Sequence, residues 1–303
     1  MDKLIQAIIA KDYNPTVVGL DPKLDYVPKF ILDECLNEAD PFAGAAEALF
    51  RYNKTLIDSL CDIVPAVKPQ SAYYEMYGIE GLKCLQKTME YAKSKGMYVI
   101  LDVKRGDIGA TAEAYSHAYI GKTDIGGKEY RAFGPDSLTV NPYLGTDGLK
   151  PFVKDAEEND KSLFILVKTS NPSSGELQDL VVDGEHIYEK TAALVRTLGE
   201  TSVGKYGYSK VGAVVGATYP EQLKELRAKM PNTFFLVPGY GAQGGKAEDV
   251  ALAFDKNRLG AIVNSRRGIM CAYKKGDWKE EQFGEAARAE AIRMRDDILA
   301  YVK

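Results

Sequence analysis

The chain has 303 residues, of which 45% are hydrophobic and 27% are charged, and its formal net charge is −4. These values are typical of a globular protein that buries a large core, as one large α/β domain or two smaller ones. The negative net charge argues against a nucleic-acid partner, so any anionic ligand must be held by a local group of basic side chains.

Neither the cysteines nor the histidines form a pattern typical of a metal or redox site. The cysteines lack C-x-x-C spacing, which predicts reduced thiols rather than a zinc site or a disulfide framework. They stand at Cys35, Cys61, Cys84 and Cys271. His117 and His186 lie in polar, helix-like segments without H-E-x-x-H spacing. A metal site or a histidine-based catalytic triad is therefore not expected.

The first 14 residues predict an amphipathic helix, with Leu4, Ile5, Ile8 and Ile9 on one side. Its apolar stretch is too short for a signal peptide or a membrane anchor. No later segment approaches the roughly 18 consecutive apolar residues that a membrane helix needs. We therefore expect a cytoplasmic protein with no membrane partner.

Beyond residue 14, eight short apolar strands each precede a helical segment. The strands are expected, in chain order, at 15–22, 63–70, 98–104, 137–143, 162–170, 211–217, 233–239 and 260–264. The helices are expected at 40–61, 78–95, 111–120, 149–157, 188–198, 220–229, 247–254 and 278–302. Local signals support these boundaries, since Asp40 and Pro41 form an N-cap and a proline at the first helical position, and Gly96 closes the second helix.

Eight strand and helix pairs without an intervening linker predict a (β/α)8 TIM barrel, as a single domain over 1–303. An open, doubly wound sheet is the structural alternative, because alternation alone does not distinguish the two. The positions of the charges favour the barrel, whose active sites lie at the C-terminal ends of the strands. Charged residues at such ends are Asp21, Lys68, Asp102, Lys104 and Lys168.

The third strand carries the strongest candidate for a site. Side chains alternate along a strand, so Asp102 and Lys104 should share one face, roughly 7 Å apart, with Asp107 on the loop beyond. A structural ion pair at the strand end is the alternative reading. The spacing D-x-K-x-x-D at the end of an apolar strand favours a functional site, because buried charges are costly unless they are paired.

Several segments together resemble orotidine 5'-phosphate decarboxylase, most closely its longer bacterial form. They are VGLDP at 18–22, AVKP at 66–69, DVKRGDIGAT at 102–111, VPGYGAQGG at 237–245 and SRRGI at 265–269. The resemblance implies a TIM barrel that converts orotidine 5'-monophosphate to uridine 5'-monophosphate and CO2. This is the last step of de novo UMP biosynthesis, and it is implied to need no metal or organic cofactor.

The resemblance also implies the catalytic residues. Loss of CO2 leaves carbanion character at C6 of the pyrimidine with no cofactor to accept electrons, so the protein must stabilise the charge and deliver a proton. Lys104 would donate that proton, and Asp102 would lie beside the substrate carboxylate. Lys68 would complete an alternating chain of lysines and aspartates, in which opposite neighbours keep each group charged despite burial.

Two residues of the same motif are implied to act across a homodimer. In the family, the positions of Asp107 and Thr111 reach the active site of the other subunit, so a monomer should be nearly inactive. For Asp107 an equally good structural reading is a cap on the helix that starts near Ile108.

The remaining implied residues bind the substrate. Asp21 and Lys68 would hold ribose hydroxyls, although each could be a solvated strand end. Ser170, or Thr169 in its place, would hydrogen-bond the pyrimidine, and the alternative is an ordinary Asn-Pro turn. Pro238 lies in a matching motif and is also expected at the substrate.

The phosphate is expected after the last two strands, as in other barrels. The glycine-rich segment 239–245 would supply backbone amides and the side-chain amide of Gln243, although a plain turn is the alternative. Arg267 matches the family's arginine, and its planar fork suits phosphate oxygens. Arg266 is expected at the surface or behind the site.

Three other functions stay open. A sugar-phosphate decarboxylase with the same D-x-K-x-x-D motif would need a magnesium site. An aldolase is suggested by 166–170, which resembles the Schiff-base strand of deoxyribose-phosphate aldolases, with Lys168 as the nucleophile. A binder of nucleotide phosphates without turnover is the third. Insertions at 23–40 and 121–135 relative to the shorter decarboxylases leave the charged positions intact.

Overall fold

The computed structural model describes residues 1–241 and 244–302. Eight parallel strands form a closed barrel in the order β1-β12-β11-β10-β7-β6-β3-β2, which confirms the predicted (β/α)8 fold. The barrel strands are β1 (Thr16–Leu20), β2 (Ala66–Pro69), β3 (Tyr98–Arg105), β6 (Ser137–Val140), β7 (Ser162–Lys168), β10 (Val211–Val215), β11 (Phe235–Val237) and β12 (Ala261–Ser265). Each lies inside or within one residue of a predicted range.

The chain divides into two compact units, and the divisions fall inside helix α1 (Asp2–Ile9), strands β3 and β12, and helix α13 (Phe283–Leu299). The first unit consists of Met1–Gln6, Val103–Asn264 and Ile298–Lys303. The second unit consists of Ala7–Asp102 and Ser265–Asp297. That the whole chain is one domain stays a prediction.

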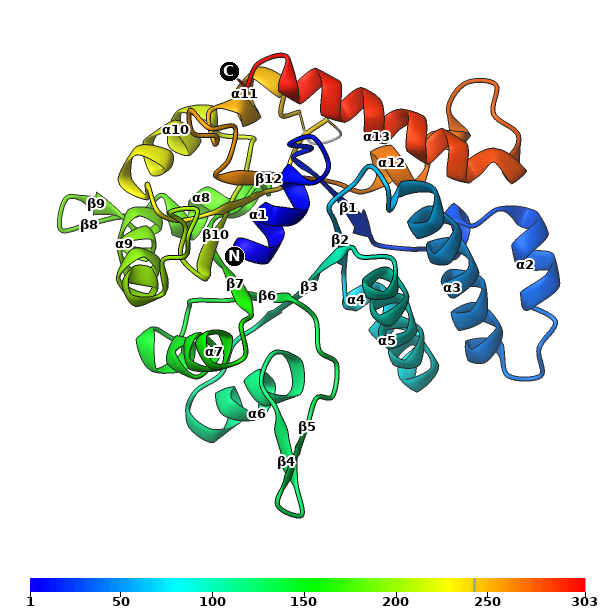
Figure 1. Cartoon of the computed structure of the whole chain (residues 1–303), viewed down its shortest axis with the longest axis horizontal. Coiled ribbons are helices and arrows are strands. Elements are labelled where there is room, and N and C mark those ends of the chain that lie inside the picture. The colour runs from blue at the N-terminus through cyan, green and yellow to red at the C-terminus, as the bar shows by residue number, and fades with distance from the viewer. Residues whose placement is uncertain (242–243, 303) are drawn as a thin grey trace. The chain divides into compact units, whose positions relative to one another are not determined.

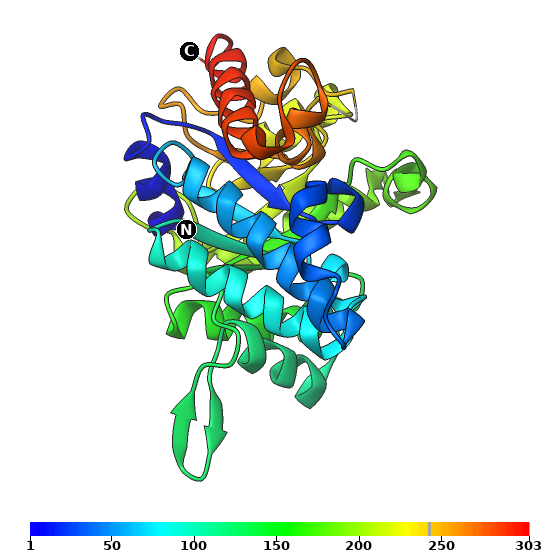
Figure 2. The same cartoon turned by 90° about the vertical axis from the view of Figure 1, so that its right-hand side faces the viewer.

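In the second unit, helices α3 (Pro41–Leu60) and α5 (Gly78–Ser94) lie side by side (Figure 2). Helix α3 begins as the sequence predicts, because the carboxylate of Asp40 accepts a hydrogen bond from the backbone N–H of Phe42 at 2.9 Å. The buried side chains of Leu49 and Leu85 contribute to the core of this unit. Its other helices are α2 (Lys29–Cys35), α4 (Ala72–Glu75), α12 (Arg267–Met270) and most of α13 (Phe283–Leu299).

In the first unit, strand β10 pairs with β7 on one side and with β11 on the other. All five residues of β10 are buried, as expected for a parallel strand covered on both faces. The helices of this unit are α6 (Gly109–Tyr119), α7 (Thr146–Glu158), α8 (Gly175–Gln178), α9 (Ile187–Gly199), α10 (Pro220–Lys229) and α11 (Ala247–Ala251). The N-terminal helix α1 (Asp2–Ile9) is shared between the two units.

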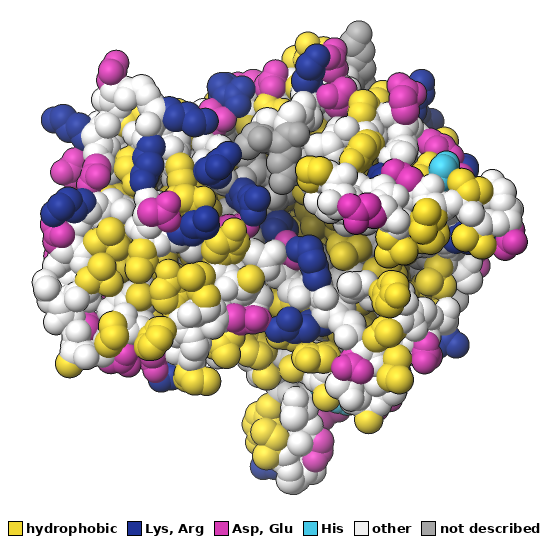
Figure 3. Space-filling view, turned by 180° about the vertical axis from the view of Figure 1, so that it is seen from behind, with side chains coloured by type: hydrophobic (Ala, Val, Ile, Leu, Met, Phe, Trp, Pro, Cys, Tyr) yellow, Lys and Arg dark blue, Asp and Glu magenta, His cyan; other side chains and the backbone are white. Residues whose placement is uncertain are grey.

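Two hairpins were not predicted from the sequence. Strands β4 (Thr123–Ile125) and β5 (Lys128–Tyr130) form a projection at the bottom of Figure 1, and Figure 3 shows hydrophobic side chains on its surface. The second pairs β8 (Val181–Val182) with β9 (Glu185–His186). Both hairpins are short and largely exposed, so they lack the apolar alternation by which half-buried strands are recognised.

The last helix starts later than predicted, at Phe283 instead of residue 278. The side-chain oxygen of Gln282 accepts a hydrogen bond from the backbone N–H of Lys279 at 3.2 Å, and a 3-10 turn over Glu280–Gln282 leads into the helix. None of the helices in the described residues has the length and apolar character required to cross a lipid bilayer.

Candidate active site

Lys68 and Asp102 form a buried ion pair in the second unit. Strands β2 and β3 are neighbours, and a further bridge pairs Gln70 with Asp102. Nζ of Lys68 lies 2.7 Å from Oδ2 of Asp102, and the two side chains are only 7% and 9% exposed. Both residues lie in the C-terminal halves of their strands, on the side where barrel active sites lie.

The environment of Lys68 favours the charged ammonium. Burial lowers its pKa, but the negative charges of Asp102 and Asp21 and the hydrogen bond to Asp102 outweigh burial, so the net pKa lies above the usual 10.5. A buried lysine that stays protonated needs such compensation. The alternating chain implied for Lys68 included Asp102, whereas Asp21 was expected only as a ribose ligand.

Asp21 is held by an arginine that the sequence did not assign to the site. It directly follows β1, in which Gly19 lies opposite Lys68 on β2. Nη1 of Arg266 donates to Oδ2 of Asp21 at 3.0 Å. The other oxygen, Oδ1, is buried without a hydrogen-bond partner within the described residues. Arg266 therefore binds one oxygen of Asp21 from a half-exposed position, and the other oxygen is available to a ligand.

Four charges thus alternate in sign in the second unit, in the order Arg266, Asp21, Lys68 and Asp102. Burial lowers the pKa of the Arg266 guanidinium, but the hydrogen bond to Asp21 and the charge of Asp21 raise it by more. Arg267 opens helix α12 and is exposed. In the described parts of the chain, its guanidinium makes no ion pair or hydrogen bond, so it is available to an anionic ligand.

Lys104 has an unusual backbone. Its φ is +47°, in the left-handed region that residues with a side chain rarely adopt. The buried hydroxyl of Thr139 on β6 accepts hydrogen bonds from the backbone N–H groups of both Val103 and Lys104, at 3.0 Å each. The chain is therefore not extended at Lys104, and alternation alone does not fix the face of its side chain. That Lys104 shares a face with Asp102 stays a prediction.

Asp107 and Thr111 lie where helix α6 begins. Oδ1 of Asp107 accepts a hydrogen bond from the N–H of Ile108, the N-cap residue of α6, at 2.8 Å. Thr111 is exposed in the first turn. The loop also packs closely on α7, because a Cβ at Gly148 would lie 2.7 Å from the carbonyl oxygen of Asp107. Glycine at this position therefore permits the approach.

The predicted base-binding residues lie just beyond β7. Ser170 is half-buried, and its carbonyl oxygen accepts a hydrogen bond from Oγ1 of Thr218 at 3.3 Å. The backbone N–H of Thr169 donates to the side-chain oxygen of Gln178, and the side-chain amide of Gln178 donates to the hydroxyl of Thr169. Pro238 is half-buried, and its carbonyl accepts from the N–H of Ala217 at 2.9 Å. Gln243 lies outside the described residues.

Lys168 does not have the environment of a Schiff-base lysine. Its side chain is fully buried, its Nζ lies 2.6 Å from Oδ1 of Asp179, and the ring of Tyr219 is 4.6 Å away. A nucleophilic lysine must present an uncharged amine to a carbonyl. The amine of Lys168 is instead occupied by Asp179 and Tyr219, and its side chain has no exposed surface from which to reach a substrate carbonyl, which disfavours the aldolase reading.

The comparisons with known proteins agree with these observations. The model of the orotidine 5'-phosphate decarboxylase / HUMPS family matches residues 18–277. The orotidine 5'-phosphate decarboxylases of Caldicellulosiruptor bescii and Rhodopirellula baltica are 46% and 44% identical to the chain. These matches cover 99% of the chain and 98% of the first relative, and 97% of both chains for the second.

A solved structure of OMP decarboxylase from Leishmania donovani superposes with a TM-score of 0.73 at 29% identity, covering 99% of this chain and 97% of that one. The barrel, the alternating charges and these matches point to the same family. The chain belongs to the orotidine 5'-phosphate decarboxylase / HUMPS family.

Proposed function

We propose that this protein decarboxylates orotidine 5'-monophosphate to uridine 5'-monophosphate and CO2, the last step of UMP biosynthesis, without a cofactor. The observation that carries the proposal is the buried pair of Lys68 and Asp102, extended by Asp21, at the C-terminal ends of strands β1 to β3. The relatives with 46% and 44% identity bear the name of this enzyme.

In this proposal, the bond between C6 and the carboxylate breaks and its electron pair stays on C6. Lys104 donates a proton to C6 as CO2 leaves, and solvent returns the proton to the lysine. Asp102 faces the substrate carboxylate, and Lys68 keeps Asp102 ionised. The rate enhancement comes from charges placed in advance around the carbanionic centre.

The ribose and the base are held by residues of different strands. Asp21 and Lys68 bind ribose hydroxyls. Oδ1 of Asp21, which has no hydrogen-bond partner among the residues that the structure describes, is suited to accept a hydrogen bond from one of them. Ser170 hydrogen-bonds the pyrimidine, with Thr169 as the alternative, and Pro238 lies against the substrate. These roles follow the family's motifs, position by position.

The phosphate is bound by the guanidinium of Arg267 and by the segment 239–245, including Gln243. The side chain of Arg267 is exposed and makes no ion pair within residues 1–241 and 244–302, which supports this role. Binding energy from the phosphate, which is remote from C6, serves to organise the site around the base.

We further propose a homodimer in which Asp107 and Thr111 enter the site of the other subunit. Their place at the start of α6 supports this role: Thr111 is exposed, and the half-buried Asp107 stands in the loop just before it. The proposed substrate and product are charged nucleotides that stay in the compartment where they are made, so we place the enzyme in the cytoplasm.

Incubation of the purified protein with orotidine 5'-monophosphate tests this function. We expect the ultraviolet absorbance of the pyrimidine to change as the carboxylate is lost, and the rate to be unaffected by EDTA. A rate abolished by EDTA favours the magnesium-dependent sugar-phosphate decarboxylase instead. No change in absorbance with the dimeric protein would overturn the proposal.

The two adjacent arginines should differ in their effects on ligand binding. We expect Arg267→Ala to weaken UMP binding by about 10- to 100-fold, because a charged hydrogen bond to phosphate is lost, and to leave uridine binding unchanged. Arg266→Ala should weaken UMP and uridine alike, because it releases Asp21, which holds the ribose. Calorimetric titration of both ligands measures this, and equal losses in Arg267→Ala would contradict the phosphate role.

A further inference from the structure

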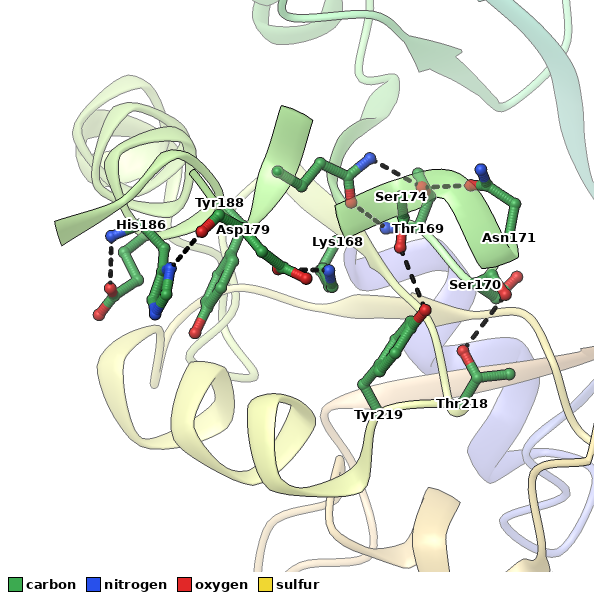
Figure 4. A network of polar contacts seen from close by, with 12 residues as sticks. Lys168, Thr169, Ser170, Asn171, Ser174, Asp179, His186, Tyr188, Thr218 and Tyr219 are labelled. Atoms are coloured by element: carbon green, nitrogen blue, oxygen red, sulfur yellow. Dashed lines mark hydrogen bonds and ion pairs between the residues drawn. The ribbon is translucent and has the colours of Figure 1, made fainter. Parts of the chain in front are cut away.

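A buried lysine terminates strand β7, and its ammonium is bound on several sides (Figure 4). The side chain of Lys168 has no exposed surface, and its Nζ lies 2.6 Å from Oδ1 of Asp179. The rings of Tyr219 and Tyr188 are 4.6 Å and 5.6 Å from Nζ. A charge in such a place is costly, so the fold retains it only with a close partner.

A register shift directs this lysine. Val214 on β10 lies opposite Leu166, but the next residue, Val215, lies opposite Lys168. Val167 is therefore an extra residue in β7, and such a bulge changes the direction of the side chain that follows it. The irregularity places Lys168 next to the segment 172–186, which contains α8 and the β8–β9 hairpin.

Gln178, which precedes Asp179, binds Thr169, which follows Lys168. Oε1 of Gln178 accepts from the backbone N–H of Thr169 at 2.9 Å, and Nε2 of Gln178 donates to Oγ1 of Thr169 at 2.8 Å. That hydroxyl donates in turn to Oδ1 of Asn171 at 2.7 Å. The end of α8 thus fixes the backbone and the side chain of Thr169 together.

The opposite side of this turn is fixed by the segment after β10. The N–H of Gly216 donates to the carbonyl of Lys168 at 2.8 Å, and Oγ1 of Thr218 donates to the carbonyl of Ser170 at 3.3 Å. A Cβ at Gly216 would lie 2.8 Å from Cβ of Ser170. Ser170 is therefore confined between two segments that both contact Lys168 or its neighbours.

Asp179 is itself held by His186, the last residue of β9 and the N-cap residue of helix α9. Nδ1 of His186 lies 2.9 Å from the carbonyl oxygen of Asp179, which requires a hydrogen on Nδ1. The ring of His186 stacks on Tyr188 at 5.0 Å between centroids, and Tyr188 also faces the ammonium of Lys168. His186 therefore contacts both Asp179 and Tyr188, and each of these two residues contacts Lys168.

We propose that Lys168 and Asp179 form a latch that positions the turn 169–171 for recognition of the pyrimidine. Lys168 does not touch the substrate in this inference; it acts through Thr169 and Ser170. The inference rests on the proposed function, which places Ser170 against the base. It goes beyond that function by assigning base selectivity to an ion pair at the end of β7.

Lys168→Met tests the latch. Methionine fills a similar volume beside the two tyrosine rings, and Asp179, whose side chain is 35% exposed, can be solvated after the ammonium is lost. We expect UMP affinity to fall by about tenfold and kcat/KM for orotidine 5'-monophosphate by up to about 100-fold, because small displacements near the reacting group are costly. Binding of ribose 5-phosphate, which has no base, should stay unchanged.

Asp179→Asn and Asp179→Ala separate positioning from general stability. Asparagine keeps an oxygen acceptor for the ammonium, so it should retain most of the UMP affinity that alanine loses. Lys190→Met is the matched control, since Lys190 lies in the same region and forms exposed ion pairs with Asp183 and Glu185, at 3.6 Å and 3.4 Å. We expect it to bind both ligands as the wild type does.

Equal losses of UMP and ribose 5-phosphate binding in Lys168→Met, or no loss of either, would overturn the latch. If Lys168→Met does not fold, as seen by circular dichroism, the two Asp179 variants give the same comparison. Turnover of orotidine 5'-monophosphate by the wild-type protein is measured separately and tests the proposed function. The ligand comparison needs no turnover, so the two failures are distinguishable.

Discussion

Replacement of Lys104 by alanine should lower turnover of orotidine 5'-monophosphate by about 10⁴-fold or more. The ammonium has two tasks in the proposed reaction, because it protonates C6 and stabilises the charge that develops there, and each contributes orders of magnitude to a rate. UMP should still bind, since the proposed contacts to phosphate and ribose do not involve Lys104. Single-turnover kinetics and calorimetry with UMP measure the two effects.

The backbone at Lys104 makes this prediction specific. A residue other than glycine at φ +47° is strained by about 1–3 kcal/mol and persists only where its surroundings hold it. The hydroxyl of Thr139 is one such restraint. Lys154→Ala, an exposed lysine on α7, is the matched control and should leave turnover unchanged. A loss of less than tenfold in Lys104→Ala would remove Lys104 as the proton donor.

The pairing of Lys68 with Asp102 could be predicted from sequence because it depends on regularities that sequence displays. Each residue lies in the C-terminal half of an apolar strand, and strands that are consecutive in a barrel lie side by side. A buried charge needs an opposite partner, and the resemblance implied a chain of charges that includes Lys68 and Asp102. The sequence therefore predicted that these two charges meet, although it also offered Lys104, on the same strand, as a partner for Asp102.

Other features of the site could not be predicted, because no pattern in the sequence indicates them. The left-handed backbone of Lys104 breaks the alternation on which the strand argument depended, and nothing marks a lysine for such a conformation. Thr139 has the pattern of an ordinary core residue. Asp179 follows Lys168 by eleven residues, in a segment whose path depends on a bulge in β7 that pattern alone does not reveal.

The contact between Arg266 and Asp21 illustrates a further limit. Asp21 follows the first barrel strand and Arg266 follows the last, and these strands become neighbours only when the barrel closes. The sequence offered two adjacent arginines with no means of telling which one faces a carboxylate. The structure assigns that contact to Arg266 and leaves Arg267 exposed.

Separate replacement of Lys68 and Asp102 should destabilise the protein, whereas replacing both should not. Lys68→Met leaves the carboxylate of Asp102 buried without its ammonium, and loss of one partner of a buried pair costs about 3–5 kcal/mol. This corresponds to a fall in Tm on the order of 10 °C. In the double variant Lys68→Met with Asp102→Leu, apolar side chains replace both charges, and Tm should return close to that of the wild type.

Activity should behave in the opposite way. Lys68→Met, Asp102→Leu and the double variant should each lose turnover by orders of magnitude. Each lacks at least one of the two charges that the proposed reaction places beside the substrate. A stable but inactive double variant would show that the pair is retained for catalysis and not for folding. Recovery of turnover in the double variant, or a Tm unchanged in Lys68→Met, would contradict the role given to these charges.

The pH dependence of stability provides an independent test of the same pair. The pKa of Lys68 is raised by folding, so its contribution is fully present below the usual 10.5 and is lost as the pH rises through the folded-state value. We therefore expect the free energy of unfolding to fall more steeply between pH 10 and higher pH in the wild type than in the double variant, which has no amine to titrate at this position. Urea titrations across this range measure both slopes, and equal slopes would mean that Lys68 is not held as an ammonium by Asp102 and Asp21.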